Sequence, residues 1–226
     1  MPDRTLLRRS INTERALTAP RPRLRGVSHL VAAVVAVPAT AIATVAVTGV
    51  RERLGVLAFG VGVAAMLSLS ALLHLRRWTA RTYERLFRLD HTGIYLTIGG
   101  TGVAIGLVGL AGWPGRILVA GALVGTLVGI VVEWLPFAPP RGLNHAVYLS
   151  YGWVSVALLP WLWAASGGVT VGLLLAGGVL YTVGAVVVAA RRPDPWPRWF
   201  GYHEVFHLLV IGAVATHAVL IGRLVA

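Results

Sequence analysis

Seven apolar stretches of about twenty residues each constrain this chain more than any other feature of its sequence. A helical stretch of this length spans the hydrocarbon core of a bilayer, and backbone groups in lipid need partners within the protein. The sequence therefore predicts an all-α integral membrane bundle of seven helices. The expected spans are Val27–Gly49, Leu54–Leu75, Thr92–Gly112, Arg116–Leu135, His145–Ala165, Val169–Ala190 and His203–Leu224.

The remaining sequence leaves no room for a soluble domain. Of the 226 residues, 57% are hydrophobic and 12% are charged, a balance that would expose a large apolar area in water. We expect residues 1–26 to form a mobile tail rich in Arg and Pro, and residues 27–226 to form the membrane domain. The chain has no cysteine, which excludes disulfides and thiolate metal sites.

The basic residues are all arginines, and they are divided unevenly between the two sides of the expected bundle. Sixteen lie on the side of the N-terminal tail and four on the other. The positive-inside rule then predicts a cytoplasmic N-terminus, an external C-terminus and a multi-pass protein of the plasma membrane. The net charge of +12 is explained by an anionic inner leaflet, so nucleic acid is not expected as a partner. No sequence feature identifies a protein partner.

Glycines recur at a spacing of four residues in two of the expected helices. Gly102 and Gly106 lie in the third span, and Gly121, Gly125 and Gly129 lie in the fourth. Small residues at this spacing form a stripe on one helix face and allow a neighbouring helix to approach closely. We therefore expect these glycines to mark close helix contacts.

Two pairs of polar residues are also spaced by four, which places each pair on one helix face. Ser70 and His74 end the second span on the cytoplasmic side, and His203 and His207 begin the seventh span on that side. Two imidazoles at this spacing can bind one metal ion, and His74 on a facing helix would add a third ligand. Three protein ligands and one open position are typical of catalytic zinc, whose bound water has a pKa near 7.

Asp90 lies at the expected cytoplasmic start of the third span, near the predicted metal site. Its carboxylate could hold the zinc-bound water or orient a ligand imidazole, or it could simply cap the helix. Ser70 could form a hydrogen bond with a ligand, with the water or with a substrate carbonyl. The spacing of these residues does not decide between the alternatives.

The other ionisable residues of the spans are expected to have structural roles. His29, His91, His145 and Glu133 lie at expected span ends, where water and lipid headgroups can satisfy them. His217 lies deeper in the seventh span, and we expect it to be buried and hydrogen-bonded.

Residues 203–207 read His-Glu-Val-Phe-His, which matches the motif of zinc metalloproteases. In that motif the glutamate, here Glu204, acts as general base. However, His217 is the only further His, Asp or Glu after His207, and no soluble segment is expected to receive a polypeptide. A membrane zinc metalloprotease is therefore a minor alternative.

Three separated blocks together resemble the hemolysin III family, within the progestin and adiponectin receptor (PAQR) group. They are Ser70-Ala-Leu-Leu-His74, the run Leu89–Leu96 with Gly99-Gly100-Thr101, and His203-Glu-Val-Phe-His207. The resemblance implies seven spans and a zinc ion in the cytoplasmic leaflet, held by His74, His203 and His207. It further implies that Asp90 contacts the zinc-bound water and that Ser70 corresponds to the serine of the family's Ser-x-x-x-His block. Glu204 has no implied role, because the family does not require Glu at that position.

Three functions remain open at this point. The first is an intramembrane zinc hydrolase of a lipid amide or ester. The resemblance implies this chemistry, since receptor relatives are linked to ceramide hydrolysis. In such an enzyme Asp90 would act as general base and then as general acid. The second is a non-enzymatic membrane-homeostasis or receptor-like protein with a structural zinc ion. The third is cytolysis, as the family name suggests, although a resident multispan protein is a poor candidate for a secreted pore-former.

Overall fold

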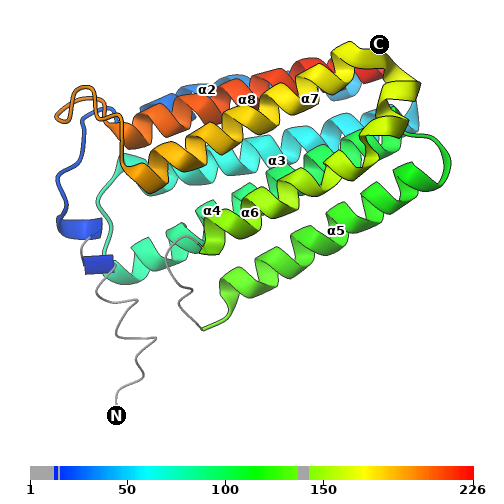
Figure 1. Ribbon diagram of the computed structural model, residues 1–226. Coiled ribbons are helices and arrows are strands. Elements are labelled where there is room, and N and C mark those ends of the chain that lie inside the picture. The colour runs from blue at the N-terminus through cyan, green and yellow to red at the C-terminus, as the bar shows by residue number, and fades with distance from the viewer. Residues whose placement is uncertain (1–12, 15, 137–142) are drawn as a thin grey trace.

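The computed structural model describes residues 13, 14, 16–136 and 143–226, and over this range the chain forms a bundle of helices (Figure 1). The predicted all-α class is confirmed for these residues. The elements are α2 (Val27–Ala46), α3 (Val50–Leu75), α4 (Ala80–Ala104), the π-helix η1 (Ile105–Gly109), α5 (Gly112–Trp134), α6 (Leu143–Trp153), the 3-10 helix η2 (Val154–Leu158), α7 (Leu159–Ala190) and α8 (Tyr202–Val225).

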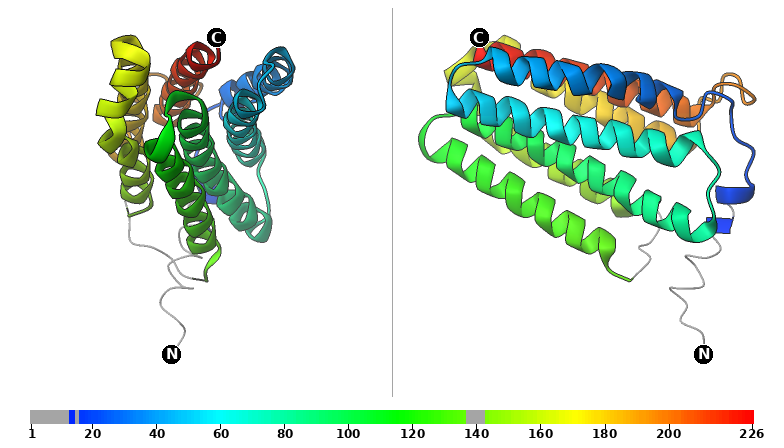
Figure 2. Two further views of the ribbon diagram at one scale, coloured as in Figure 1. Left: turned by 90° about the vertical axis from the view of Figure 1, so that its right-hand side faces the viewer. Right: turned by 180° about the vertical axis from the view of Figure 1, so that it is seen from behind.

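Helices that follow one another in the sequence are neighbours in space. Figure 2 shows α2, α3, α4 and α5 packed in this order, while α8 lies between α7 and α2. The starts of α2 and α8 lie at one end of the bundle, and the C-terminus lies at the other (Figure 1). The first end contains His74 and His203 and is called the histidine end below, and the other is called the remote end.

Within the described part of the chain, six helical stretches are long and apolar enough to cross a membrane. One of them, Leu143–Ala190, has 48 residues and covers two of the predicted spans. It is interrupted at Gly167, whose φ of 77° is not helical. The indole N–H of Trp153 donates to the Thr182 hydroxyl at 3.1 Å, so the two parts of this stretch lie against each other (Figure 1).

Helix α4 begins much earlier than the predicted span Thr92–Gly112. Its first residue is Ala80, and the Thr79 side chain caps it by accepting a hydrogen bond from the Thr82 N–H at 3.4 Å. The expectation that Asp90 begins or caps this helix is therefore wrong, because Asp90 lies in its third turn. Hydropathy detects only the apolar part of a helix, and the first turns of α4 are rich in arginine.

Glycines bring α3 and α4 into close contact. A Cβ atom at Gly62 would overlap the Leu96 carbonyl of α4, and one at Gly93 would lie 2.7 Å from the Met66 Cα of α3. The Thr97 hydroxyl donates to the Gly62 carbonyl at 3.0 Å across the same interface. This contact fixes the spacing of the two helices, which also carry Ser70, His74 and Asp90.

The glycines singled out by their spacing have different surroundings. A Cβ at Gly102 would lie 2.9 Å from the Ala122 Cβ, and one at Gly106 would lie 2.9 Å from the Gly115 carbonyl oxygen, so both pack on α5 as predicted. The two glycines at positions 125 and 129 instead leave room for the rings of Tyr151 and Tyr95. The prediction is wrong for Gly121, which faces open space.

The segment before α2 lies against the histidine end, although we expected it to be mobile. The Leu24 N–H donates to the Trp199 carbonyl at 3.0 Å, and the Arg23 guanidinium lies 4.4 Å from the centre of the Trp199 ring. Arg21 donates to the Arg76 carbonyl at 2.6 Å, at the end of α3. These contacts hold residues 21–26 against the bundle, while residues 1–12 and 15 of the expected tail lie outside the described residues. The mobility of the tail stays a prediction.

We predict that Gly62→Ala lowers the stability of the bundle by about 1–3 kcal/mol, because the added methyl group meets backbone atoms of α4. The measurement is thermal unfolding of the purified protein in detergent. Gly121→Ala is the matched control, since nothing lies within 4 Å of its Cβ position. Equal melting temperatures for the two variants would contradict the assigned contact.

Candidate metal centre

Three histidines meet at the histidine end of the bundle. His74 lies in the last turn of α3, and His203 and His207 lie in the first two turns of α8. One nitrogen of each ring lies within 4.8 Å of the corresponding nitrogens of the other two. The four-residue spacing places both α8 imidazoles on the face that packs toward α3. The structure thus brings together the three residues that the sequence suggested as metal ligands.

The geometry of this cluster fits a metal ion with nitrogen ligands. The Nε2 atoms of His74 and His203 are 3.1 Å apart. Two nitrogens bound to one tetrahedral zinc ion, each at about 2.0–2.1 Å, would be about 3.3 Å apart. His207 completes the set and is only 1% exposed. Within the described residues, the cluster contains three histidines and no carboxylate, so these side chains would leave a tetrahedral ion one position open.

Ser70 and Asp90 form a second polar pair, one helical turn from His74. Ser70 is buried on α3, and its side chain interacts with the Asp90 carboxyl of α4. Ser70 and His74 are separated by four residues, or about 6 Å along the helix axis. Their assigned roles, with Asp90 acting on a water molecule and Ser70 supporting it, stay predictions.

Glu204 stabilises the start of α8. Its Oε2 atom accepts a hydrogen bond from the Gly201 N–H at 2.8 Å, and its Oε1 atom lies 2.5 Å from Arg25 Nε. Both carboxylate oxygens are therefore engaged away from the three histidine nitrogens, and the side chain is 1% exposed. This arrangement favours helix capping and ion pairing over the general-base role that Glu has in the protease motif.

The segment before α2 covers His74. Gly26 has a φ of +82°, and a Cβ atom there would lie 2.9 Å from the His74 Cβ. Only glycine combines this left-handed conformation with so close an approach. Arg21 donates to the His74 carbonyl, so the same segment also satisfies a backbone acceptor at the end of α3.

His29 is a fourth imidazole at this site, and the sequence analysis missed it. We expected an interfacial residue, but His29 is 2% exposed and its ring is stacked on His207. The ring centres are 3.7 Å apart and the planes differ by 11°. The sequence around a single histidine at a helix start does not indicate whether the side chain is buried. His29 is buried because α2 packs against α8.

Two further predictions for ionisable residues had different outcomes. His91 Nδ1 lies 3.3 Å from Glu133 Oε1, with both side chains largely buried between α4 and α5, so the interfacial expectation for them is wrong. His217 is buried, and its Nε2 atom lies 3.3 Å from the Leu174 carbonyl. The expectation that His217 is a buried hydrogen-bonded residue is therefore confirmed.

The fold and the histidine cluster together define a class: a multi-pass membrane protein with a three-histidine site that could hold a metal ion. The family model described as Haemolysin-III related matches residues 17–218 of this sequence. The chain therefore belongs to the hemolysin III family, and its relatives place it within the PAQR group.

Several known proteins are similar to this chain over most of its length. Hemolysin-3 of Bacillus cereus is 30% identical over 193 residues, which are 84% of each chain. The adiponectin receptor protein of Drosophila melanogaster is 28% identical over 74% of this chain but only 41% of its own length. A rice protein named heptahelical transmembrane protein ADIPOR2 is 29% identical over 74% of this chain and 80% of its own.

We predict that His29→Ala weakens Co²⁺ binding by about tenfold, because a residue that supports a ligand ring tunes metal affinity. His29→Phe keeps an aromatic ring against His207 and should retain the affinity within about threefold. The measurement is a Co²⁺ absorption titration of metal-stripped protein, with His145→Ala as control. Unchanged affinity in His29→Ala would show that the stacked ring does not support the site.

Proposed function

We propose that this protein is an intramembrane zinc hydrolase that cleaves an amide or ester bond of a lipid. The observation that carries the proposal is the convergence of His74, His203 and His207 within 4.8 Å at the ends of membrane helices. Three neutral imidazoles with room for one more ligand are typical of catalytic zinc. The site lies within a bundle of apolar helices, so a substrate with an acyl chain is the class that reaches it from the bilayer.

His74, His203 and His207 would hold the zinc ion, which would supply a Lewis acid able to polarise a carbonyl and acidify water. Asp90 accepts a proton from the attacking water and returns it to the leaving amine or alcohol as the bond to the carbonyl carbon breaks. Ser70 interacts with the Asp90 carboxyl and would help to orient it. Arg25 and Glu204 hold the start of α8, and with it His203 and His207, in place.

A non-enzymatic protein with a structural metal ion is the second candidate. The cluster joins α3 to α8, so an ion held there would stabilise the fold whether or not chemistry follows. Structural zinc sites usually have four protein ligands, whereas this cluster offers three histidines among the described residues. The number of ligands therefore supports the hydrolase over the structural role.

For the topology we propose seven spans with a cytoplasmic N-terminus. Two observations support the count: the 48-residue stretch folds back on itself at Gly167, and α2 and α8 begin at the same end of the bundle. The rice relative is also named heptahelical. The excess of arginines toward the histidine end supports the orientation.

Metal analysis is the first test of the proposed function. We predict about one zinc per chain in detergent-purified protein, because three imidazoles and one open position form a complete catalytic site. His74→Ala, His203→Ala and His207→Ala should each lose it. The measurement is inductively coupled plasma mass spectrometry, and a wild-type protein without zinc would overturn the proposal.

Asp90→Asn separates the hydrolase from the structural alternative. We expect this variant to keep zinc and to lose about two orders of magnitude or more of lipid-amide turnover, because it lacks the general base. A variant that loses zinc as fully as His207→Ala would show instead that Asp90 is needed to hold the ion. His145→Ala, at a histidine outside the cluster, is the control that should retain both zinc and turnover.

The absence of cysteine makes the topology directly testable. We predict that a cysteine introduced by Arg53→Cys reacts with an impermeant maleimide in intact cells, because Arg53 lies at the remote end. A cysteine introduced by Arg81→Cys should react only after permeabilisation. The reverse labelling pattern would contradict the proposed orientation, and labelling of both in intact cells would contradict separation of the two ends.

A further inference from the structure

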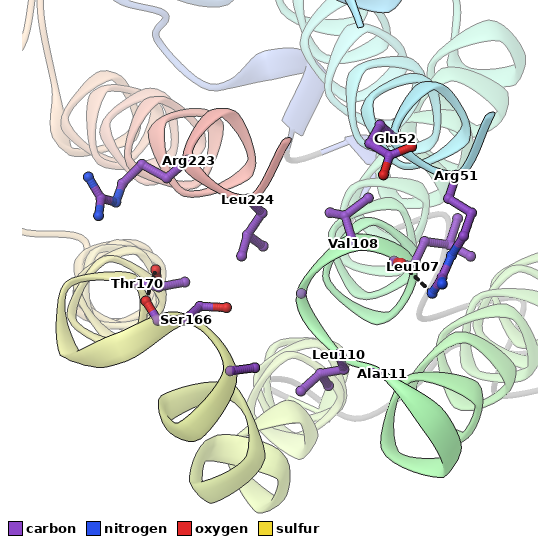
Figure 3. A pocket seen from close by; sticks show the side chains of 12 residues that line it. Arg51, Glu52, Leu107, Val108, Leu110, Ala111, Ser166, Thr170, Arg223 and Leu224 are labelled. Atoms are coloured by element: carbon purple, nitrogen blue, oxygen red, sulfur yellow. Dashed lines mark hydrogen bonds between the residues drawn. The ribbon is translucent and has the colours of Figure 1, made fainter. Parts of the chain in front are cut away.

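The remote end of the bundle contains two adjoining cavities. The first has a volume of about 440 Å³ and lies between the starts of α3 and α7, η1 and the end of α8 (Figure 3). The second, of about 310 Å³, lies between η1 and α5. Arg51, Leu107 and Leu110 line both, so the two cavities share a wall.

Three of the four arginines at this end line the cavities. Arg51 lines both, Arg223 lines the first and Arg116 lines the second. One Arg51 nitrogen donates to the Leu107 carbonyl at 2.6 Å, which places the guanidinium at the shared wall (Figure 3). Glu52 is the one acidic residue among the described residues that line either cavity. The local charge therefore favours an anion.

The second cavity is otherwise apolar and open to the side of the bundle. Apart from its arginines it is lined by aliphatic residues and glycines, including Val119 and Leu123. Leu123 is 58% exposed, so the cavity faces the lipid phase. The π-helix η1 ends at Gly109, and Gly112 has a φ of +69°, so the chain changes direction beside the cavity instead of filling it.

We propose that these cavities bind a phospholipid with a net negative headgroup. Its phosphate lies at Arg51, where the two cavities meet, and one acyl chain lies along Val119 and Leu123. Arginine is suited to this role because its planar guanidinium can donate two hydrogen bonds to one phosphate. The proposal concerns the remote end alone and does not depend on the histidine cluster.

The test is native mass spectrometry of the full-length protein, released from nanodiscs that contain equal amounts of phosphatidylglycerol and phosphatidylcholine with identical chains. We expect the wild type to retain phosphatidylglycerol preferentially. Arg51→Gln combined with Arg116→Gln should lower that retention by about tenfold or more, since the double variant lacks both guanidinium groups that line the second cavity. Val119→Trp, which fills the apolar cavity without removing a charge, should also lower it.

Arg53→Gln is the matched control. Arg53 lies at the same end and donates to the Val47 carbonyl at 2.8 Å, but it lines neither cavity. Equal retention of the two lipids by the wild type, or equal loss in Arg53→Gln and the double variant, would overturn the proposal. Displacement of the lipid by millimolar inorganic phosphate would identify a site for the free anion instead. Melting temperatures verify that each variant is folded. If the double arginine variant does not fold, Val119→Trp still tests the proposal.

Discussion

A bilayer offers no water to buried polar groups, so each polar side chain inside this bundle depends on a partner within the protein. Where helices cross, hydroxyl groups meet backbone carbonyls, as Thr97 does with Gly62. At the histidine end the partners are side chains from different segments, such as Arg25 before α2 with Glu204 of α8. These contacts hold α2, α3, α4 and α8 in one arrangement, which brings the three histidines together at one end of the bundle.

Much of the fold could be predicted from hydropathy, since the apolar stretches follow directly from the thickness of a membrane. The errors lie where helices leave the apolar layer. Helix α4 continues from Thr92 back to Ala80 through a segment rich in arginine, because backbone hydrogen bonding in water does not stop at the lipid boundary. The break at Gly167 lies between the two spans His145–Ala165 and Val169–Ala190, as the sequence predicted.

The candidate site was predictable to the extent that its residues are paired along a helix. His203 and His207 reveal a shared face by their spacing, and Ser70 with His74 does the same. His29 has no such partner in sequence, and only the packing of α2 on α8 brings it to His207. The role of Glu204 was likewise hidden, because its partner Arg25 is distant in sequence and belongs to a segment that looked like a mobile tail.

His74 and His203 are separated by 129 positions in the sequence. During synthesis, α3 leaves the ribosome long before α8, so the two imidazoles can meet only after α8 has been made. The segment before α2 makes a second contact between distant parts of the sequence, because the Leu24 N–H donates a hydrogen bond to the Trp199 carbonyl. The segment before α2 and the segment before α8 are thus joined in one place. A chain stalled or cleaved before Tyr202 lacks this junction, so the cluster distinguishes completed insertion from every intermediate that precedes it.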